Sequence, residues 1–137
     1  KKMVVKSELK KIYHELKENH KAQYFLCDSD ITVHVFDNAS KIGFLSPIYF
    51  GGSYIPKSVR EGMKKTPPFE KLQAIKTYIT VDEPNFRVFL HYIGSMESLN
   101  QNKLEGLIEE FEFLSGEWRI YLDDHDKNDL IYVRNPK

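Results

Sequence analysis

The feature that most constrains the fold of this chain is an apolar stripe near its C-terminal end. Large apolar residues recur there every three or four positions, which is the repeat of one face of an α-helix. They are Leu104, Leu107, Ile108, Phe111, Leu114, Trp118 and Tyr121. About five turns of helix must therefore lie against a hydrophobic surface. Ser98 and Gln101 have the spacing of a capping box, which predicts that the helix begins there.

The end of this helix is open to two interpretations. Gly116 could terminate it, and residues 118–123 and 130–134 would then form a last hairpin. The spacing of the stripe runs through Tyr121 without a slip in phase, and this favours a continuous helix to about Asp123. The sequence leaves residues 117–134 between these alternatives.

The length and composition predict one domain, residues 1–137. Apolar residues make up 41% of the chain and charged residues 29%, which are ordinary globular values. Cys27 is the single cysteine, so no internal disulfide can form. No apolar stretch approaches the roughly 20 residues that a membrane span needs. We therefore expect a soluble, cytoplasmic protein without membrane contact.

The formal net charge of zero hides a polarity along the chain. Residues 1–76 contain 14 Lys and Arg against 8 Asp and Glu, a net charge of +6, whereas residues 77–137 contain 6 against 12, a net charge of −6. The two halves are expected to attract each other or a partner. A nucleic-acid-binding domain would normally be basic throughout.

The first half of the chain predicts a helix followed by strands. Ser7 is a plausible N-cap for a helix that ends near His20 and has its apolar side on Leu9, Ile12, Tyr13 and Leu16. Residues 24–36 alternate as extended structure does, and a further strand is predicted from Lys41 to Phe50. Gly43 and Pro47 interrupt that strand, which favours a bulge or a position at the edge of the sheet.

The second half predicts a punctuated connection and a hairpin before the long helix. Residues 51–68 hold six of the 13 Gly and Pro residues of the chain around a helical turn at 58–65, and we expect a mobile connection there. Alternating residues then predict two strands joined by a turn at 82–85. The fold class that follows is α+β, an antiparallel sheet with an N-terminal helix and a long C-terminal helix packed on it.

No group of residues predicts catalysis or metal binding. Residues 124–129 begin like a calcium loop, but Asp129 occupies the position that needs glycine, so a solvated turn is expected. Cys27 could pair with His34 or His91 as nucleophile and base, yet no nucleophile motif surrounds the cysteine. The sequence therefore predicts a protein that is not an enzyme and has no cofactor and no metal.

The order of elements carries a resemblance to a known family. The segments SELKKIYHEL, KLQAIKTYITVDEPNFRVFLHYIG and LEGLIEEFEFLSGEWRIYL resemble the first helix, the hairpin and the last helix of the type III secretion chaperones, the Tir-chaperone-like family, and of the related YbjN-like fold. The resemblance implies a cytoplasmic homodimer that holds an extended segment of a secreted effector protein. Members of that family are usually acidic and use a leucine-rich helix to dimerise, and this chain departs from both patterns.

The predicted partner-binding residues lie on the strand from Lys41 to Phe50 and beside it on the first helix. An edge strand can accept a strand from a partner through main-chain hydrogen bonds. The residues are Phe44, Leu45, Ile48, Tyr49, Phe50 and Tyr13. The alternative is a small nucleic-acid-binding domain that uses the lysines of the first helix and stacks bases on the strand aromatics.

Overall fold

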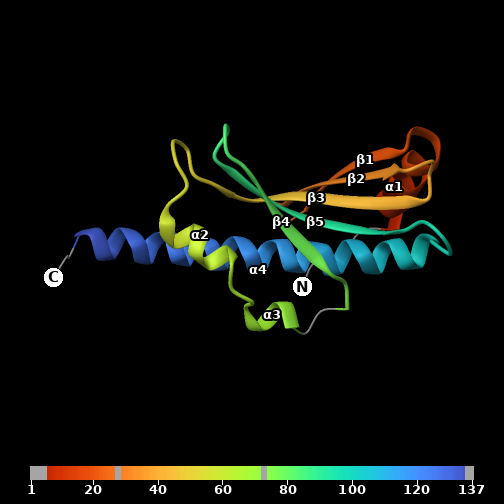
Figure 1. Cartoon of the computed structure of the whole chain (residues 1–137). Coiled ribbons are helices and arrows are strands. Elements are labelled where there is room, and N and C mark those ends of the chain that lie inside the picture. The colour runs from red at the N-terminus through yellow and green to blue at the C-terminus, as the bar shows by residue number, and fades with distance from the viewer. Residues whose placement is uncertain (1–5, 27–28, 72–73, 135–137) are drawn as a thin grey trace.

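A five-stranded antiparallel sheet lies along one long helix in the computed structural model, which describes residues 6–26, 29–71 and 74–134 (Figure 1). Side chains are described for residues 9–22, 30–70 and 74–127. In chain order the elements are α1 Lys6–Asn19, β1 Lys21–Leu26, β2 Ser29–Phe36, β3 Lys41–Phe50, α2 Lys57–Met63, α3 Pro68–Lys71, β4 Thr77–Asp82, β5 Arg87–Ser95 and α4 Gln101–Arg134. The predicted fold class is confirmed.

The strands follow the spatial order β1, β2, β3, β5, β4, and every neighbouring pair is antiparallel. The strand from Lys41 to Phe50 has its predicted bounds, but the prediction of an edge position is wrong, because β3 pairs with β2 on one side and with β5 on the other. A register shift between Pro47 and Tyr49 forms the irregularity that proline requires in a central strand. The bulge interpretation is confirmed.

The segment 24–36 contains the end of β1 and the whole of β2 rather than one continuous strand. β1 and β2 pair as a hairpin, with Leu26 opposite Ser29. Cys27, which the sequence offered as a nucleophile, lies outside the described residues. The second hairpin, β4 with β5, agrees with the prediction, since Asp82 lies opposite Arg87 across the predicted turn.

α4 settles the alternatives for the C-terminal part of the chain. It is a single helix of 34 residues, Gln101–Arg134, and the predicted last hairpin is wrong. The acidic stretch at 124–129 is likewise part of this helix and not a turn. Figure 1 shows α4 running beneath the sheet and continuing past it at the C-terminal end, where α2 lies alongside.

The start of α4 is capped differently from the prediction. The Asn100 Oδ1 atom accepts a hydrogen bond of 2.9 Å from the backbone N–H of Lys103, so Asn100 is the N-cap. Ser98 lies two residues earlier, with a positive φ of 65°. At the other end of the chain α1 begins at Lys6, so Ser7 lies within the helix and is not its cap.

The apolar stripe of α4 faces the sheet, as predicted. Leu104, Ile108, Phe111 and Leu114 are fully buried, and Trp118 is 3% exposed. Phe111 meets the β3 residue Phe44 edge to face, with ring centroids 5.3 Å apart. Apolar residues of α1 join the same core, and α1 contacts both α4 and β1. Both long helices therefore lie on one face of the sheet.

The connection from 51 to 68 contains the predicted helical turn as α2 and is packed against α4. Val59 and Gly62 are buried, and a Cβ at Gly62 would lie 3.1 Å from the imidazole of His125. Glycine thus lets α2 approach α4 closely. Two glutamates hold the next segment to the helices: Glu110 accepts the N–H groups of Ala74 and Ile75, and Glu70 accepts the indole N–H of Trp118.

Candidate partner-binding surface

The sheet has an inner face, which α1 and α4 cover, and an outer face, on which no element of residues 6–26, 29–71 and 74–134 packs (Figure 1). Because side chains alternate along a strand, one set of residues from β2 to β4 points outward. We call ten of its uncharged side chains the outer face; the same set also includes the charged residues Asp30, Lys41, Asp82 and Arg87, which lie at or next to the ends of their strands. The outer face consists of Thr32, His34, Phe36, Leu45, Pro47, Tyr78, Thr80, Phe89, His91 and Ile93.

The outer face is apolar at its centre, and the charged residues on the same side of the sheet lie toward the strand ends. Leu45 of β3 lies opposite Thr32 on one side and His91 on the other. Ile93 is 47% exposed and Tyr78 46% exposed, whereas the inward residues Val88 and Leu90 on β5 are fully buried. An exposed area of this kind on a sheet is a candidate surface for binding another molecule.

Rings on the outer face stack in pairs. His34 stacks on Phe36 with centroids 5.2 Å apart, and Tyr78 stacks on His91 with centroids 4.7 Å apart and planes only 7° from parallel. These contacts lie within one strand or between neighbouring strands. They fix the rings relative to one another, and we call the surface that they help to form the platform.

Charged side chains border this platform, and one of them, Arg87, reaches over it. Arg87 lies over the ring of Phe89 at 5.2 Å and contacts the carboxylate of Asp82 at 3.4 Å. Lys21 of β1 is opposite His34 in register. Hydrogen bonds from Asn85 and Arg87 hold the pKa of Asp82 below its usual value.

The predicted partner-binding residues do not form one surface. Phe44 and Ile48 are each 1% exposed on the inner face, and Tyr49, 8% exposed, donates a hydrogen bond of 3.0 Å from its hydroxyl to Asp126 of α4. Burial, together with that hydrogen bond to the nearby carboxylate, raises the pKa of Tyr49 strongly. These three side chains build the core and are not accessible to a partner in this structure.

Three of the predicted residues lie outside the core. Leu45 is at the centre of the outer face. Phe50, 67% exposed, lies opposite Arg87 at the end of β3 beside a hollow of about 440 Å³. Tyr13 is half-buried on α1, where the Lys17 ammonium lies 5.4 Å from its ring. Since α1 packs on the inner side of the sheet, Tyr13 is not on the outer face.

The partner-binding residues predicted from the sequence do not include several residues of the outer face, among them His34, Phe89, His91 and Ile93. The signal for them was present, because they alternate with buried residues along β2 and β5. Alternation identifies two faces but does not tell which one the helices cover. The nucleic-acid-binding alternative requires the α1 lysines and the strand aromatics to lie on one surface. Because α1 lies on the opposite side of the sheet from the outer face, these lysines and the outer-face aromatics do not form one surface.

A second concave area borders the free edge of β4. One hollow of about 280 Å³ is lined by Met63, Glu70, Tyr78, Ile79 and Trp118, among others, and its neighbour of about 370 Å³ shares Met63 and Ile79. Arg60 of α2 lines the second hollow.

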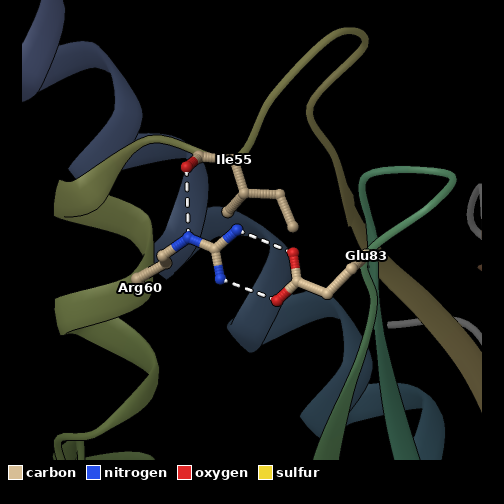
Figure 2. A network of polar contacts seen from close by, with 3 residues as sticks. All are labelled: Ile55, Arg60 and Glu83. Carbon is tan, nitrogen blue, oxygen red and sulfur yellow. Dashed lines mark hydrogen bonds and ion pairs between the residues drawn. The ribbon is translucent and has the colours of Figure 1, made fainter.

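Arg60 also ties α2 to the turn between β4 and β5, and Figure 2 shows its guanidinium held from two sides. It donates to both carboxylate oxygens of Glu83 at 2.9 and 3.0 Å, and its Nε donates to the carbonyl of Ile55 at 3.3 Å. This bidentate pair joins the basic half of the chain to the acidic half.

The described residues hold no group of three or more His, Cys, Asp or Glu side chains that could bind a metal ion. Among the same residues, no helix is long and apolar enough to cross a membrane.

The fold has relatives among solved structures, while no protein-family model and no curated protein matches the sequence. A chain of the ExsC–ExsE complex superposes with a TM-score of 0.60 and 10% identity over 88% of this chain and 97% of that one. The HopA1–SchA chaperone–effector complex gives a TM-score of 0.55 and 13% identity, covering 83% and 91% of the two chains.

A third solved structure is the Yersinia pestis type III secretion chaperone SycH bound to a fragment of YscM2. It gives a TM-score of 0.53 and 7% identity, covering 82% of this chain and 97% of that chain. At sequence identities this low, the comparisons show the fold of this chain and do not show which partner it binds. This chain has the fold of the type III secretion chaperones.

Proposed function

We propose that this protein is a non-catalytic, chaperone-like module that binds a segment of a secreted partner protein on its outer face. The observation that carries the proposal is the apolar area on β2, β3, β5 and β4 that α1 and α4 leave uncovered. Its support in the comparisons is that proteins with this fold occur in complexes with effectors.

The central position of β3 changes how such binding would work. Both edges of β3 are already hydrogen-bonded, so a partner cannot add a strand to it. Binding would instead depend on apolar side chains that cover Leu45, Phe89 and Ile93, at roughly 25 cal/mol for each Å² of apolar surface removed from water. Selectivity would come from the shape of the platform and the charges around it.

The sequence resemblance also leads us to propose a cytoplasmic homodimer. Light scattering at micromolar concentration should give twice the monomer mass of 16.1 kDa. A mass of 16.1 kDa at all concentrations would remove the dimer from the proposal but would not affect the outer face.

Affinity capture from the native cytoplasm, read by mass spectrometry, tests the function. We expect the parent protein to recover a secreted protein in stoichiometric amount, and a Leu45→Lys, Ile93→Lys variant to lose it. The matched control is Ile120→Lys, because Ile120 is 60% exposed on α4, away from the outer face. Loss of capture with the control but not with the outer-face variant would contradict the proposal.

A further inference from the structure

Two histidines occupy the middle of the outer face. His34 of β2 and His91 of β5 lie on either side of β3, opposite Gly43 and Leu45 respectively. They are half-buried, unlike His14 and His20 at α1, which are exposed. A molecule that covers Leu45 must therefore also contact or cover both imidazoles.

The imidazole of His34 lies close over the backbone of β3. A Cβ built at Gly43 would be 2.8 Å from its Cε1 and 3.2 Å from the ring of Phe36, so glycine leaves room for the imidazole in its observed position. His91 is fixed by its stack on Tyr78 and by a contact of 2.7 Å between its Nε2 and the Thr80 hydroxyl. Both rings are thus held in place as parts of the platform.

No carboxylate is hydrogen-bonded to either ring in the described part of the chain. The charged groups on the outward side of the neighbouring strands are Lys21 on β1, Asp30 on β2, Lys41 on β3, Asp82 on β4 and Arg87 on β5. Asp82 contacts Asn85 and Arg87, and Lys41 lies 3.6 Å from Asp37. Lys21, opposite His34, is itself a cation, so a proton on His34 would meet repulsion.

The environment favours the uncharged form of both histidines. Burial lowers the pKa of His34, and the charge of Lys21 lowers it further. The pKa of His91 is lowered by burial and then by the nearness of His34. At neutral pH both imidazoles are therefore uncharged, and acidification would place two cations near the centre of the platform.

We propose that the outer face takes an uncharged, apolar segment of the partner and releases it on acidification, because His34 and His91 must stay neutral beneath it. This inference rests on the proposed function and adds the chemistry and the regulation of the site. The argument for an uncharged, apolar occupant is complementarity: Leu45 at the centre is flanked by Thr32 and His91, whereas the charged residues on this side, including Arg87 over Phe89, lie toward the strand ends.

Proton linkage gives the sign of the effect. A covering segment removes water from both rings and lowers their affinity for protons further, so the complex binds fewer protons than the free protein. Affinity should be constant above the pKa of the free histidines and should fall as the pH drops through it, by up to about tenfold for each pKa unit by which binding lowers each histidine.

Calorimetry with a defined probe tests this proposal. The probe is an end-capped amphipathic peptide of 18 residues made of Leu, Ala, Ser and Gln, titrated into the full chain at pH 7.5 and pH 5.5. We expect affinity to weaken at least threefold at the lower pH. Titration at pH 6.0 in two buffers of different ionisation enthalpy should show protons released on binding.

Two double variants test whether His34 and His91 cause the pH dependence of peptide binding. His34→Gln, His91→Gln should bind equally at both pH values and release no protons, whereas His14→Gln, His20→Gln should behave as the parent. Circular dichroism at pH 5.5 checks that each variant is folded.

Binding that does not change with pH in the parent, or a pH effect that survives the His34→Gln, His91→Gln change, overturns the proton linkage. Absence of peptide binding at pH 7.5 overturns the uncharged occupant. Neither result touches the capture experiment above, which tests the proposed function separately.

Discussion

The inner and outer faces of the sheet are built from the same strands, yet they differ in the exposure of their side chains and in what packs on them. On β3, Phe44 is 1% exposed and meets Phe111 of α4, while its neighbour Leu45 points the other way onto the open platform. The difference teaches that one strand can supply a core residue and a docking residue at adjacent positions. Substitutions on the inner face should therefore change the stability of the protein, and substitutions on the outer face should change its binding to a partner.

The largest effect is expected from a charge placed on the inner face. Ile48→Lys buries an ammonium where the side chain is 1% exposed, which should cost about 5 kcal/mol or more and unfold most of the protein. Leu45→Lys, three residues earlier on the outer face, should remain folded. Urea unfolding of both variants checks this pair, and equal stabilities would show that the two faces are wrongly assigned.

A cavity at the helix–sheet contact should have the next largest effect. Phe111→Ala removes a fully buried ring and should lower the free energy of unfolding by about 3 to 5 kcal/mol. Phe113→Ala on the same helix is the control, since Phe113 is 49% exposed and its loss should change little. A loss below about 1 kcal/mol for Phe111→Ala would mean that the stripe does not pack on the sheet.

The helix cap gives a smaller effect. Asn100→Ala removes the side-chain acceptor of the Lys103 N–H and should cost about 1 kcal/mol. Ser98→Ala should be close to neutral if Asn100 is the cap. Thermal unfolding of the two variants compares them directly, and the reverse order would restore the capping box at Ser98.

The smallest effect is a pH dependence of stability that arises on the outer face. Because the folded pKa values of His34 and His91 are lowered, the unfolded chain binds more protons than the folded one as the pH falls below about 6.5. Their contribution is present above that pH and is lost as the pH falls through their folded pKa values. Replacing both by Gln should flatten the stability profile between pH 7 and pH 5, and an unchanged profile would mean that other groups cause it.

Much of the fold could be predicted from the sequence, because it depends on local periodicity. The three-and-four spacing from Leu104 to Tyr121 and the alternation along β4 and β5 report directly on helix and strands. The central place of β3 could not be predicted in this way. Gly43 and Pro47 are disfavoured in a central strand, and only the packing of His34 over Gly43 and the register shift after Pro47 explain why they are tolerated.

The binding surface was predicted less well than the fold, for a physical reason. Alternation separates Phe44 from Leu45 but leaves open which of them faces the helices, since both are large and apolar. That choice depends on the register of β3 with β2 and β5, which joins residues about ten to fifty positions apart. Of the six predicted residues, Leu45 alone belongs to the outer face as defined here.

Thiol footprinting of the complex tests the central claim most directly, namely that a partner covers the outer face. In a Cys27→Ser background, single cysteines at Leu45, Ile93 and, as a control, Ile120 on α4 would be labelled with a maleimide in the free protein and with the captured partner bound. The account predicts that labelling at Leu45 and Ile93 slows at least tenfold in the complex while labelling at Ile120 does not change. Protection at Ile120 with full reactivity at Leu45 and Ile93 would contradict it.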